Sequence, residues 1–182
     1  MRKVKLFLFL IIFLWTSSGY ASEVGVWNVL MNNVSKTWNS KQFELYVPIN
    51  IWHNRLTYDH DKIKEYNERP WGIGFGKYHI DEKKNQHSLY AMAFKDSHND
   101  WEPIFGYAWQ KNWYLDCAEN WIISLGYTLG VTMRSDYDWI PIPVPLPIAS
   151  IEYKRFSVQS TYIPGFGKNT GNVLFTWLKW KF

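Results

Sequence analysis

Histidine and cysteine are the scarce reactive side chains of this 182-residue chain. It has five histidines and one cysteine, and imidazole is the side chain that titrates near neutral pH. No metal-ligand spacing joins four of the histidines, which are His60, His79, His87 and His98. The lone Cys117 can form no disulfide within the chain. His53 follows a tryptophan, and by itself such a histidine is more often structural than catalytic. The elements that would position a reactive group must therefore be considered.

The end of the chain, residues 174–182, has the pattern of a strand with one apolar face. Leu174, Leu178, Trp180 and Phe182 share one parity, and strand side chains alternate with a period of two. A soluble protein rarely leaves such a strand unprotected, whereas a strand of an outer-membrane barrel turns this face to lipid. On this segment alone, an ordinary core strand is an equal alternative.

The start of the chain has the three parts of a secretory signal peptide. Three basic residues precede the apolar run 6–15, which is too short to span a bilayer as a helix, and small Gly19 and Ala21 follow it. We expect residues 1–21 to be removed, with a retained anchor as the alternative. The mature chain would then begin at Ser22.

Composition favours an exported membrane protein over a nucleic-acid binder. The chain holds twelve tryptophans and twelve tyrosines, which suit aromatic girdles at the two membrane surfaces. Its net charge is +4, but three of the twenty basic residues and none of the sixteen acidic ones lie in the signal peptide. The mature chain therefore carries a net charge of only +1, which argues against a nucleic-acid partner.

Residues 22–41 are expected to form an amphipathic helix at the periplasmic membrane surface. Their apolar side chains recur at helical spacing, at Trp27, Leu30, Met31, Val34 and Trp38. A helix docked on a soluble core is the alternative.

Residues 42–182 are predicted to be an all-β domain, an eight-stranded antiparallel transmembrane β-barrel. The strand-like runs are 44–56, 71–80, 88–95, 104–113, 121–133, 139–150, 152–162 and 172–182. With both termini in the periplasm, connections 57–70, 96–100, 135–138 and 164–171 fall on the outer side.

The alternation predicts a small, nearly uncharged barrel interior. Glycines share one face of the second and fourth runs, namely Gly72, Gly74, Gly76 and Gly106. Side chains normally fill an eight-stranded barrel, so we expect these glycines to leave a cavity that suits a hydrocarbon chain. The alternative is that they only relieve strain in a sharply curved sheet.

Prolines predict gaps in the barrel wall. A proline has no N–H for the ladder, and a closed barrel offers no free edge for one. The prolines concerned are Pro48 and Pro70, the cluster Pro141, Pro143, Pro145 and Pro147, and Pro164. A gap beside an apolar interior would admit a lipid sideways, although some of these prolines are equally explained by bulges or turns.

Five blocks of the chain resemble the outer-membrane lipid A palmitoyltransferases (PagP). They are Ile51-Trp-His-Asn-Arg55, Tyr66-Asn-Glu-Arg-Pro-Trp-Gly72, Leu89-Tyr-Ala-Met-Ala-Phe-Lys-Asp-Ser97, Trp101-Glu-Pro103 and Thr161-Tyr-Ile-Pro-Gly165. The resemblance runs from the helix to Phe182. It implies an eight-stranded barrel in the outer membrane of a Gram-negative bacterium, with the catalytic rim facing outside. The implied reaction moves a palmitoyl chain from a glycerophospholipid to a hydroxyl of an acyl chain on lipid A, without a cofactor or metal. Its expected consequence is resistance to cationic antimicrobial peptides.

The resemblance also implies the site residues. The family's required residues map onto His53, Asp96 and Ser97: a general base, a carboxylate that can fix its tautomer, and a hydroxyl. No Gly-x-Ser-x-Gly surrounds Ser97, so positioning of the ester is favoured over attack as a nucleophile. Lys62 matches a lipid A recognition position, and Arg69 could serve the same end.

The resemblance assigns Pro48 and Pro70 to one lateral opening and Pro147 and Pro164 to the other. Two departures from the family pattern stand out. At the floor of the acyl cavity the family typically has Gly where this chain has Ala108, which predicts a shorter or less strictly selected acyl chain. The last outer loop, 166–170, lacks a tyrosine linked to phospholipid entry, so gating is expected to differ.

Two other classes of function stay open. A non-catalytic small barrel, such as an adhesin, predicts a packed or charged interior. A soluble periplasmic lipid carrier of lipocalin type predicts a polar exterior. For the acyltransferase we expect a monomer, with a homodimer as the alternative.

Overall fold

The computed structural model describes residues 23–182, so the expected signal peptide lies outside the described residues. The helix α2, Glu23–Trp38, precedes the first strand, as expected. No helix within residues 23–182 is long and apolar enough to cross a bilayer. The chain divides into two compact units, residues 1–33 and residues 34–182.

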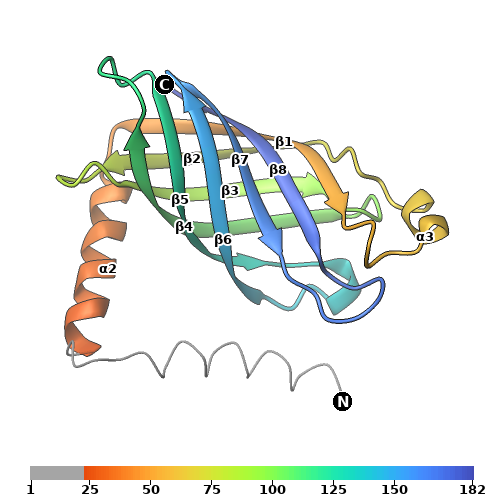
Figure 1. The fold of residues 1–182 in the computed structure, drawn as a ribbon. Helices are drawn as coiled ribbons and strands as arrows, with labels where there is room; N and C mark the ends of the chain where they lie inside the picture. The colour runs from red at the N-terminus through yellow and green to blue at the C-terminus, as the bar shows by residue number, and fades with distance from the viewer. Residues whose placement is uncertain (1–22) are drawn as a thin grey trace. The chain divides into compact units, whose positions relative to one another are not determined.

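The second unit is a closed barrel of eight antiparallel strands, in which β1 pairs with β8 (Figure 1). The strands are β1 (Gln42–His53), β2 (Gly72–Ile80), β3 (Gln86–Lys95), β4 (Trp101–Tyr114), β5 (Trp121–Thr132), β6 (Ile142–Tyr153), β7 (Phe156–Ile163) and β8 (Val173–Lys181). We call the end of the barrel at which β1 stops the rim, and the opposite end the base. The predicted fold class is confirmed, and all four connections expected on the outer side lie at the rim.

Several strand ends differ from the expected ones by a few residues, and the break between β6 and β7 was placed wrongly. The sequence suggested a break near Ile151, but β6 continues to Tyr153 and returns through a turn at Lys154 and Arg155. Lys154 adopts a left-handed conformation with φ of 56°. Tight hairpins usually mark this conformation with Gly, Asn or Asp, so the turn carries no sequence signal.

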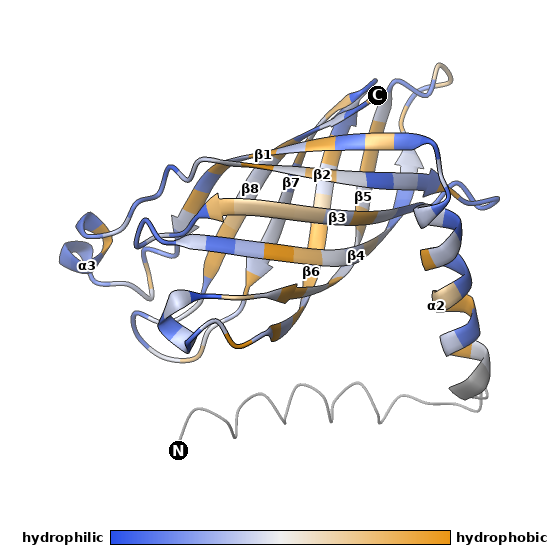
Figure 2. Cartoon of the chain, turned by 180° about the vertical axis from the view of Figure 1, so that it is seen from behind, coloured by the Kyte–Doolittle hydropathy of each residue, from blue (hydrophilic) through white to orange (hydrophobic). Residues whose placement is uncertain are grey.

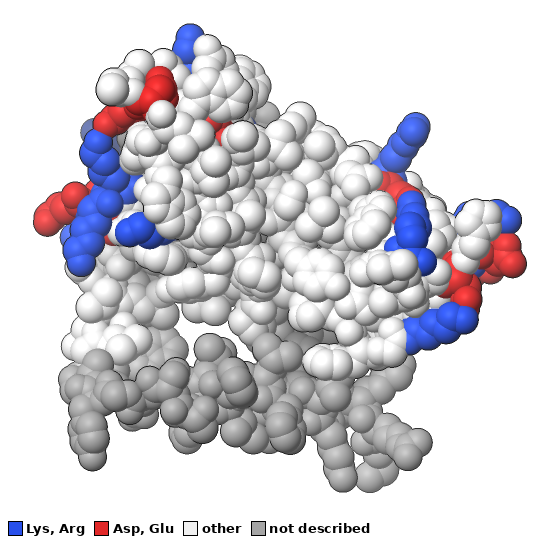
Figure 3. All heavy atoms as spheres, in the orientation of Figure 1, with Lys and Arg blue, Asp and Glu red and all other residues white. Residues whose placement is uncertain are grey.

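The outer surface of the barrel is apolar between two charged ends. On β8, Leu178, Trp180 and Phe182 are exposed while Trp177 and Lys179 are buried, which confirms the predicted alternation. The barrel wall alternates in hydropathy along its strands (Figure 2). Lys, Arg, Asp and Glu gather over the two ends and leave an uncharged band between them (Figure 3). This pattern is typical of a barrel that spans a membrane.

The wall lacks strand pairing at two places near the rim. β1 and β2 pair only from Gln42 opposite Tyr78 to Tyr46 opposite Gly74. Pro48 lies in β1 beyond this point, at a register shift in the pairing with β8, and buried Pro70 precedes β2. The predicted gap beside these prolines therefore coincides with a loss of pairing.

The second gap lies between β6 and β7, which pair only from Ile148 opposite Thr161 to the base. β6 keeps its pairing with β5 through Pro143, Pro145 and Pro147. Backbone groups of alternate residues face opposite neighbours, so prolines at alternate positions remove N–H groups from one side of β6 only. That side faces β7.

The expectation of a nearly uncharged interior is wrong at the base of the barrel, where charged side chains are buried. Lys179 is 1% exposed and lies between Glu44 at 3.2 Å and Glu152 at 3.8 Å. Lys181 adds a second contact to Glu152, at 2.6 Å. Tyr46 donates a hydrogen bond to Glu44. The parity rule located these inward positions, but strong mutual pairing lets charged side chains occupy them.

The glycines do not leave the expected vacancy either. A Cβ at Gly74 would lie 2.7 Å from the Met92 Cβ, and one at Gly76 would lie 2.9 Å from the ring of Tyr46. At Gly72 the nearest atoms are backbone atoms of Ala93 and Phe94, both within 2.5 Å, and at Gly106 the nearest atom is the carbonyl oxygen of Leu129, at 2.8 Å. The neighbouring strands therefore take the space that the glycines provide, and none of the four glycines lines the cavity described below.

The buried charges give a first prediction. Lys179→Met leaves Glu44 without its ammonium partner, and breaking a buried ion pair destabilises a protein by roughly 3–5 kcal/mol. We expect a loss of this size in the free energy of unfolding, measured by guanidinium titration of the barrel in detergent micelles. Lys83→Met, in an exposed turn at the base, is the control. Equal unfolding free energies for the two variants would show that the buried ammonium does not stabilise the barrel.

Candidate active site

His53 is the last residue of β1 and lies at the rim. Its side chain is almost fully buried. The ring of Tyr66 stacks on the imidazole at 4.7 Å, and Tyr58 meets it edge-on at 4.9 Å. Both tyrosines come from the β1–β2 connection, residues 54–71. The imidazole plane is therefore fixed by packing, and only its two nitrogens are left to form polar contacts.

The two ring nitrogens have different partners. Nδ1 lies 3.1 Å from Oε1 of Glu68, and Nε2 lies 3.2 Å from Oγ of Ser97. An ionised carboxylate can only accept, so Nδ1 carries the hydrogen and Nε2 presents its lone pair to the serine hydroxyl. A serine, a histidine and a carboxylate thus lie in the order that activates a hydroxyl group.

Glu68 is held in its ionised form. Arg55 donates to both of its oxygens, at 2.7 and 2.6 Å, and this bidentate contact lowers the pKa of Glu68 from 4.5 to about 2. Partial burial opposes the shift, and hydrogen bonds from His53 add to it. The carboxylate is therefore charged across the physiological pH range.

Asp96 occupies a different place from the one expected. Its Oδ1 accepts the backbone N–H groups of His98 and Asp100, at 2.8 and 2.9 Å, and its Oδ2 accepts from Arg134 at 3.0 Å. Within residues 23–182 no hydrogen bond or ion pair joins Asp96 to His53, so the expectation that Asp96 contacts Nδ1 is wrong. The carboxylate instead folds the turn 96–100, which carries Ser97.

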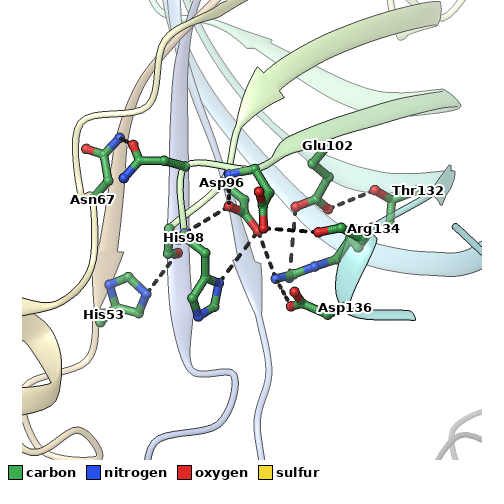
Figure 4. A network of polar contacts seen from close by, with 12 residues as sticks. His53, Asn67, Asp96, His98, Glu102, Thr132, Arg134 and Asp136 are labelled. Atoms are coloured by element: carbon green, nitrogen blue, oxygen red, sulfur yellow. Dashed lines mark hydrogen bonds and ion pairs between the residues drawn. The ribbon is translucent and has the colours of Figure 1, made fainter. Parts of the chain in front are cut away.

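Arg134 is the centre of the polar network beneath this turn (Figure 4). It lies between Asp96, Asp136 at 2.8 Å and Glu102 at 3.9 Å. Asp96, His98 and Asp136 could also approach one metal ion. The guanidinium already neutralises both of these aspartates, so the arrangement reads as an ion-pair cluster.

The connection 54–71 joins the two halves of the site. The backbone N–H of Asn67 donates to the carbonyl of Ser97 at 2.8 Å, and the N–H of Ile51 donates to the carbonyl of Glu68 at 3.0 Å. The side chain of Asn67 also donates to Asn99, at 2.7 Å. Residues 67 and 68 therefore bind the Ser97 turn on one side and β1 on the other.

The two residues expected to recognise lipid A, Lys62 and Arg69, lie in the same connection as Glu68, and both are exposed. Lys62 lies in the short helix α3, His60–Lys64, where it is exposed and pairs with Glu65 at 2.6 Å. Its Nζ is 5.8 Å from the ring of Tyr66, which stacks on His53. Arg69 is also exposed. Both cations can reach an anionic group outside the barrel.

A cavity occupies the barrel interior below the rim. Its lining on β4 runs from Ile104 to Gln110, roughly 20 Å along the strand. Apolar residues form much of the wall, including Met92, Ile104, Leu146, Ile148 and Phe175. Ala108, the expected floor residue, is part of the lining and is 5% exposed.

Amide groups close the cavity toward the base. Gln159 accepts from the Trp177 indole at 2.9 Å and donates to Gln110 at 2.6 Å, and Gln110 donates to Ser150 at 3.0 Å. A buried and fully paired polar layer is rigid. The cavity is therefore apolar along its length and bounded by a fixed polar end.

Comparison with known proteins identifies the family. The family model described as "Antimicrobial peptide resistance and lipid A acylation protein PagP" matches residues 33–179. This chain belongs to the PagP family. The match covers the whole barrel except its last two residues, together with the end of α2.

Curated members of the PagP family are similar over most of the chain. The chain is 55% identical over 172 residues to a protein of Yersinia enterocolitica named "Lipid A acyltransferase PagP", covering 92% of this chain and 84% of that one. It is 57% identical to a protein of the same name from Erwinia tasmaniensis, covering 86% and 82%. A third, from Laribacter hongkongensis, is 54% identical, covering 86% and 75%.

Sequence reasoning missed Glu68 and Arg55, although both lie in blocks that carried the resemblance to PagP. Fifteen residues separate Glu68 from His53, and no helix or strand period relates the two positions. The available signal was the proline-marked gap beside β1. A connection that returns along this gap can place residue 68 opposite residue 51.

The Arg134 cluster gives a second prediction. Arg134→Met leaves Asp96 without its cation, which should loosen the turn 96–100. We expect hydrogen exchange at the His98 and Asp100 amides, which donate to Asp96, to rise at least tenfold. Arg155→Met, at an exposed turn of the base, is the matched control. Unchanged protection in Arg134→Met would show that Asp96 holds the turn without the arginine.

Proposed function

We propose that this protein is a lipid A acyltransferase that moves a palmitoyl or similar chain from a glycerophospholipid to a hydroxyl of an acyl chain on lipid A. One observation carries the proposal: in a PagP family chain, the Nε2 lone pair of His53 faces the Ser97 hydroxyl at the rim of a barrel with an apolar cavity. The curated relatives carry the name of this activity.

The reaction exchanges one ester for another. His53 removes the proton of the lipid A hydroxyl through Nε2, and the oxygen attacks the ester carbonyl of the phospholipid. The tetrahedral intermediate collapses as the bond to the glycerol oxygen breaks, and the imidazolium returns the proton to this leaving oxygen. The products are acylated lipid A and a lysophospholipid, and no electrons are gained or lost.

Ser97 fits two roles in this scheme. Its hydrogen bond to Nε2 is the contact of an activated nucleophile, which would form an acyl-serine before transfer. The same hydroxyl can instead position the ester or donate to the oxyanion, which the missing Gly-x-Ser-x-Gly turn favours. Asp96 serves either role by building the turn that carries Ser97.

The lipid substrates reach the site from the membrane in which the barrel lies. We place it in the outer membrane, because the uncharged band of its surface suits hydrocarbon, with the rim outside. The wall gaps beside Pro48 and Pro70, and beside Pro147 and Pro164, are the routes of lateral entry. Lys62 and Arg69 bind lipid A phosphates, and the protein acts as a monomer. The modified envelope would resist cationic antimicrobial peptides.

A third prediction tests the activity itself. Lipid A from cells that express the protein should gain the mass of one fatty acyl group, and His53→Ala should abolish the gain because the base is lost. His60→Ala, an exposed histidine of the same connection, should keep it. Mass spectrometry of extracted lipid A makes the measurement. No gain with the folded wild-type barrel would favour a non-catalytic membrane barrel.

A fourth prediction concerns chain length. The Ala108 methyl shortens the cavity, so the preferred acyl chain should be shorter, or less strictly selected, than palmitoyl. Ala108→Gly should shift the preference toward palmitoyl, by roughly tenfold per methylene. Assays with phospholipids of defined chain length measure the ratio. Strict palmitoyl selection by the wild-type protein would contradict the assignment of Ala108 as the floor.

A further inference from the structure

The side chain of Glu68 makes four hydrogen bonds with only two residues, His53 and Arg55. One oxygen, Oε1, accepts from both the backbone N–H and the ring Nδ1 of His53, each at 3.1 Å, and from Arg55 at 2.7 Å. The second oxygen accepts from Arg55 at 2.6 Å. Contact with backbone and ring of the same residue fixes the side-chain torsions of that histidine as well as its tautomer.

We propose that Glu68, clamped by Arg55, is the residue that positions the His53 base, by holding the hydrogen on Nδ1 so that the Nε2 lone pair faces Ser97. The inference rests on the proposed acyl transfer and adds a residue to it. Asp96 then has the separate task of holding the Ser97 turn. The two carboxylates act on opposite partners of the Ser97–His53 hydrogen bond.

The charge of Glu68 suits this role. A carboxylate on Nδ1 stabilises the imidazolium that forms when Nε2 takes a proton. Arg55 keeps the carboxylate ionised and turns its oxygens toward His53, because a guanidinium fork matches a carboxylate in one plane. Arg55 also donates to the carbonyl of His53 at 2.9 Å. Backbone and side chain of the base are thus held by the same ion pair.

The backbone gives an independent argument. The carbonyl of Glu68 is tied to Ile51, and the N–H of Asn67 is tied to Ser97. Two consecutive residues therefore set the distance between His53 and the hydroxyl that faces it. Misplacement of reacting groups by about 1 Å can lower the rate about a hundredfold, so we expect these backbone hydrogen bonds to affect the rate of the reaction.

Several titratable or charged groups face His53 or lie near it and can affect its pKa. They are Glu68 and Arg55, the rings of Tyr58 and Tyr66, and His98, whose ring meets Tyr66 at 5.2 Å. Of these, Glu68 is the only acid in contact with the imidazole. Its loss removes the negative charge that favours the protonated base.

The test is a comparison of Glu68→Gln with Glu82→Gln, a matched exposed glutamate at the base. With the barrel reconstituted in detergent and defined lipids, we expect Glu68→Gln to lower kcat about a hundredfold, with KM within threefold. The acidic limb of its kcat profile should move to lower pH, which a loosened loop would not cause. Glu68→Asp should recover part of kcat, and Glu82→Gln should match the wild type.

The possible results separate the two proposals. Activity of Glu68→Gln within threefold of wild type, with an unmoved pH profile, overturns the role of Glu68 provided that His53→Ala is inactive. If His53→Ala is fully active, the proposed function of His53 fails instead. Nitrogen-15 NMR of wild-type His53 needs no variant. A hydrogen on Nδ1 supports the positioning role of Glu68, and a hydrogen on Nε2 in the neutral ring overturns it.

Discussion

Backbone hydrogen bonding is the constraint on which this structure depends. A strand in hydrocarbon cannot leave its N–H and C=O groups unpaired, so the sheet must close. Near the rim the closure is incomplete, and other groups supply the partners. The Glu68 carbonyl accepts from Ile51, and the Thr161 hydroxyl donates to the carbonyl of Pro147. Prolines on one side of β6 remove donors that would otherwise face a missing neighbour. Irregular contacts thus supply partners for backbone groups of Ile51 and Pro147, one at each gap.

The first gap links the wall to the chemistry. The connection that fills it carries Glu68, whose carbonyl pairs with β1 and whose carboxylate reaches His53. The same arrangement, a carboxylate paired with an arginine, occurs twice at the rim. Glu68 is held by Arg55 and contacts the His53 imidazole, while Asp96 is held by Arg134 and shapes the turn that carries Ser97. Arg55 comes from the same connection as Glu68, whereas Arg134 comes from the β5–β6 connection and reaches Asp96 across the rim.

The interior is divided by polarity along the barrel. Paired charges, including Lys179 and Glu44, occupy the base, amides follow, and apolar side chains surround the cavity toward the rim. Buried polar groups are tolerated here because nearly all of them have partners. The amide layer bounds the cavity toward the base, and Ala108 lies in its lining.

The sequence determined the parity of each strand, the number of strands and the prolines that mark the gaps, because these follow from a period of two and from a missing N–H group. The resemblance to PagP added His53 and Ser97. The tertiary structure alone decided which carboxylate reaches the imidazole, because Glu68 arrives through an irregular connection with no period. It also decided that the neighbouring strands approach Gly72, Gly74, Gly76 and Gly106 too closely for a Cβ, so that these glycines leave no void. Contacts across the barrel depend on register and side-chain volume, and neither can be read from one strand at a time.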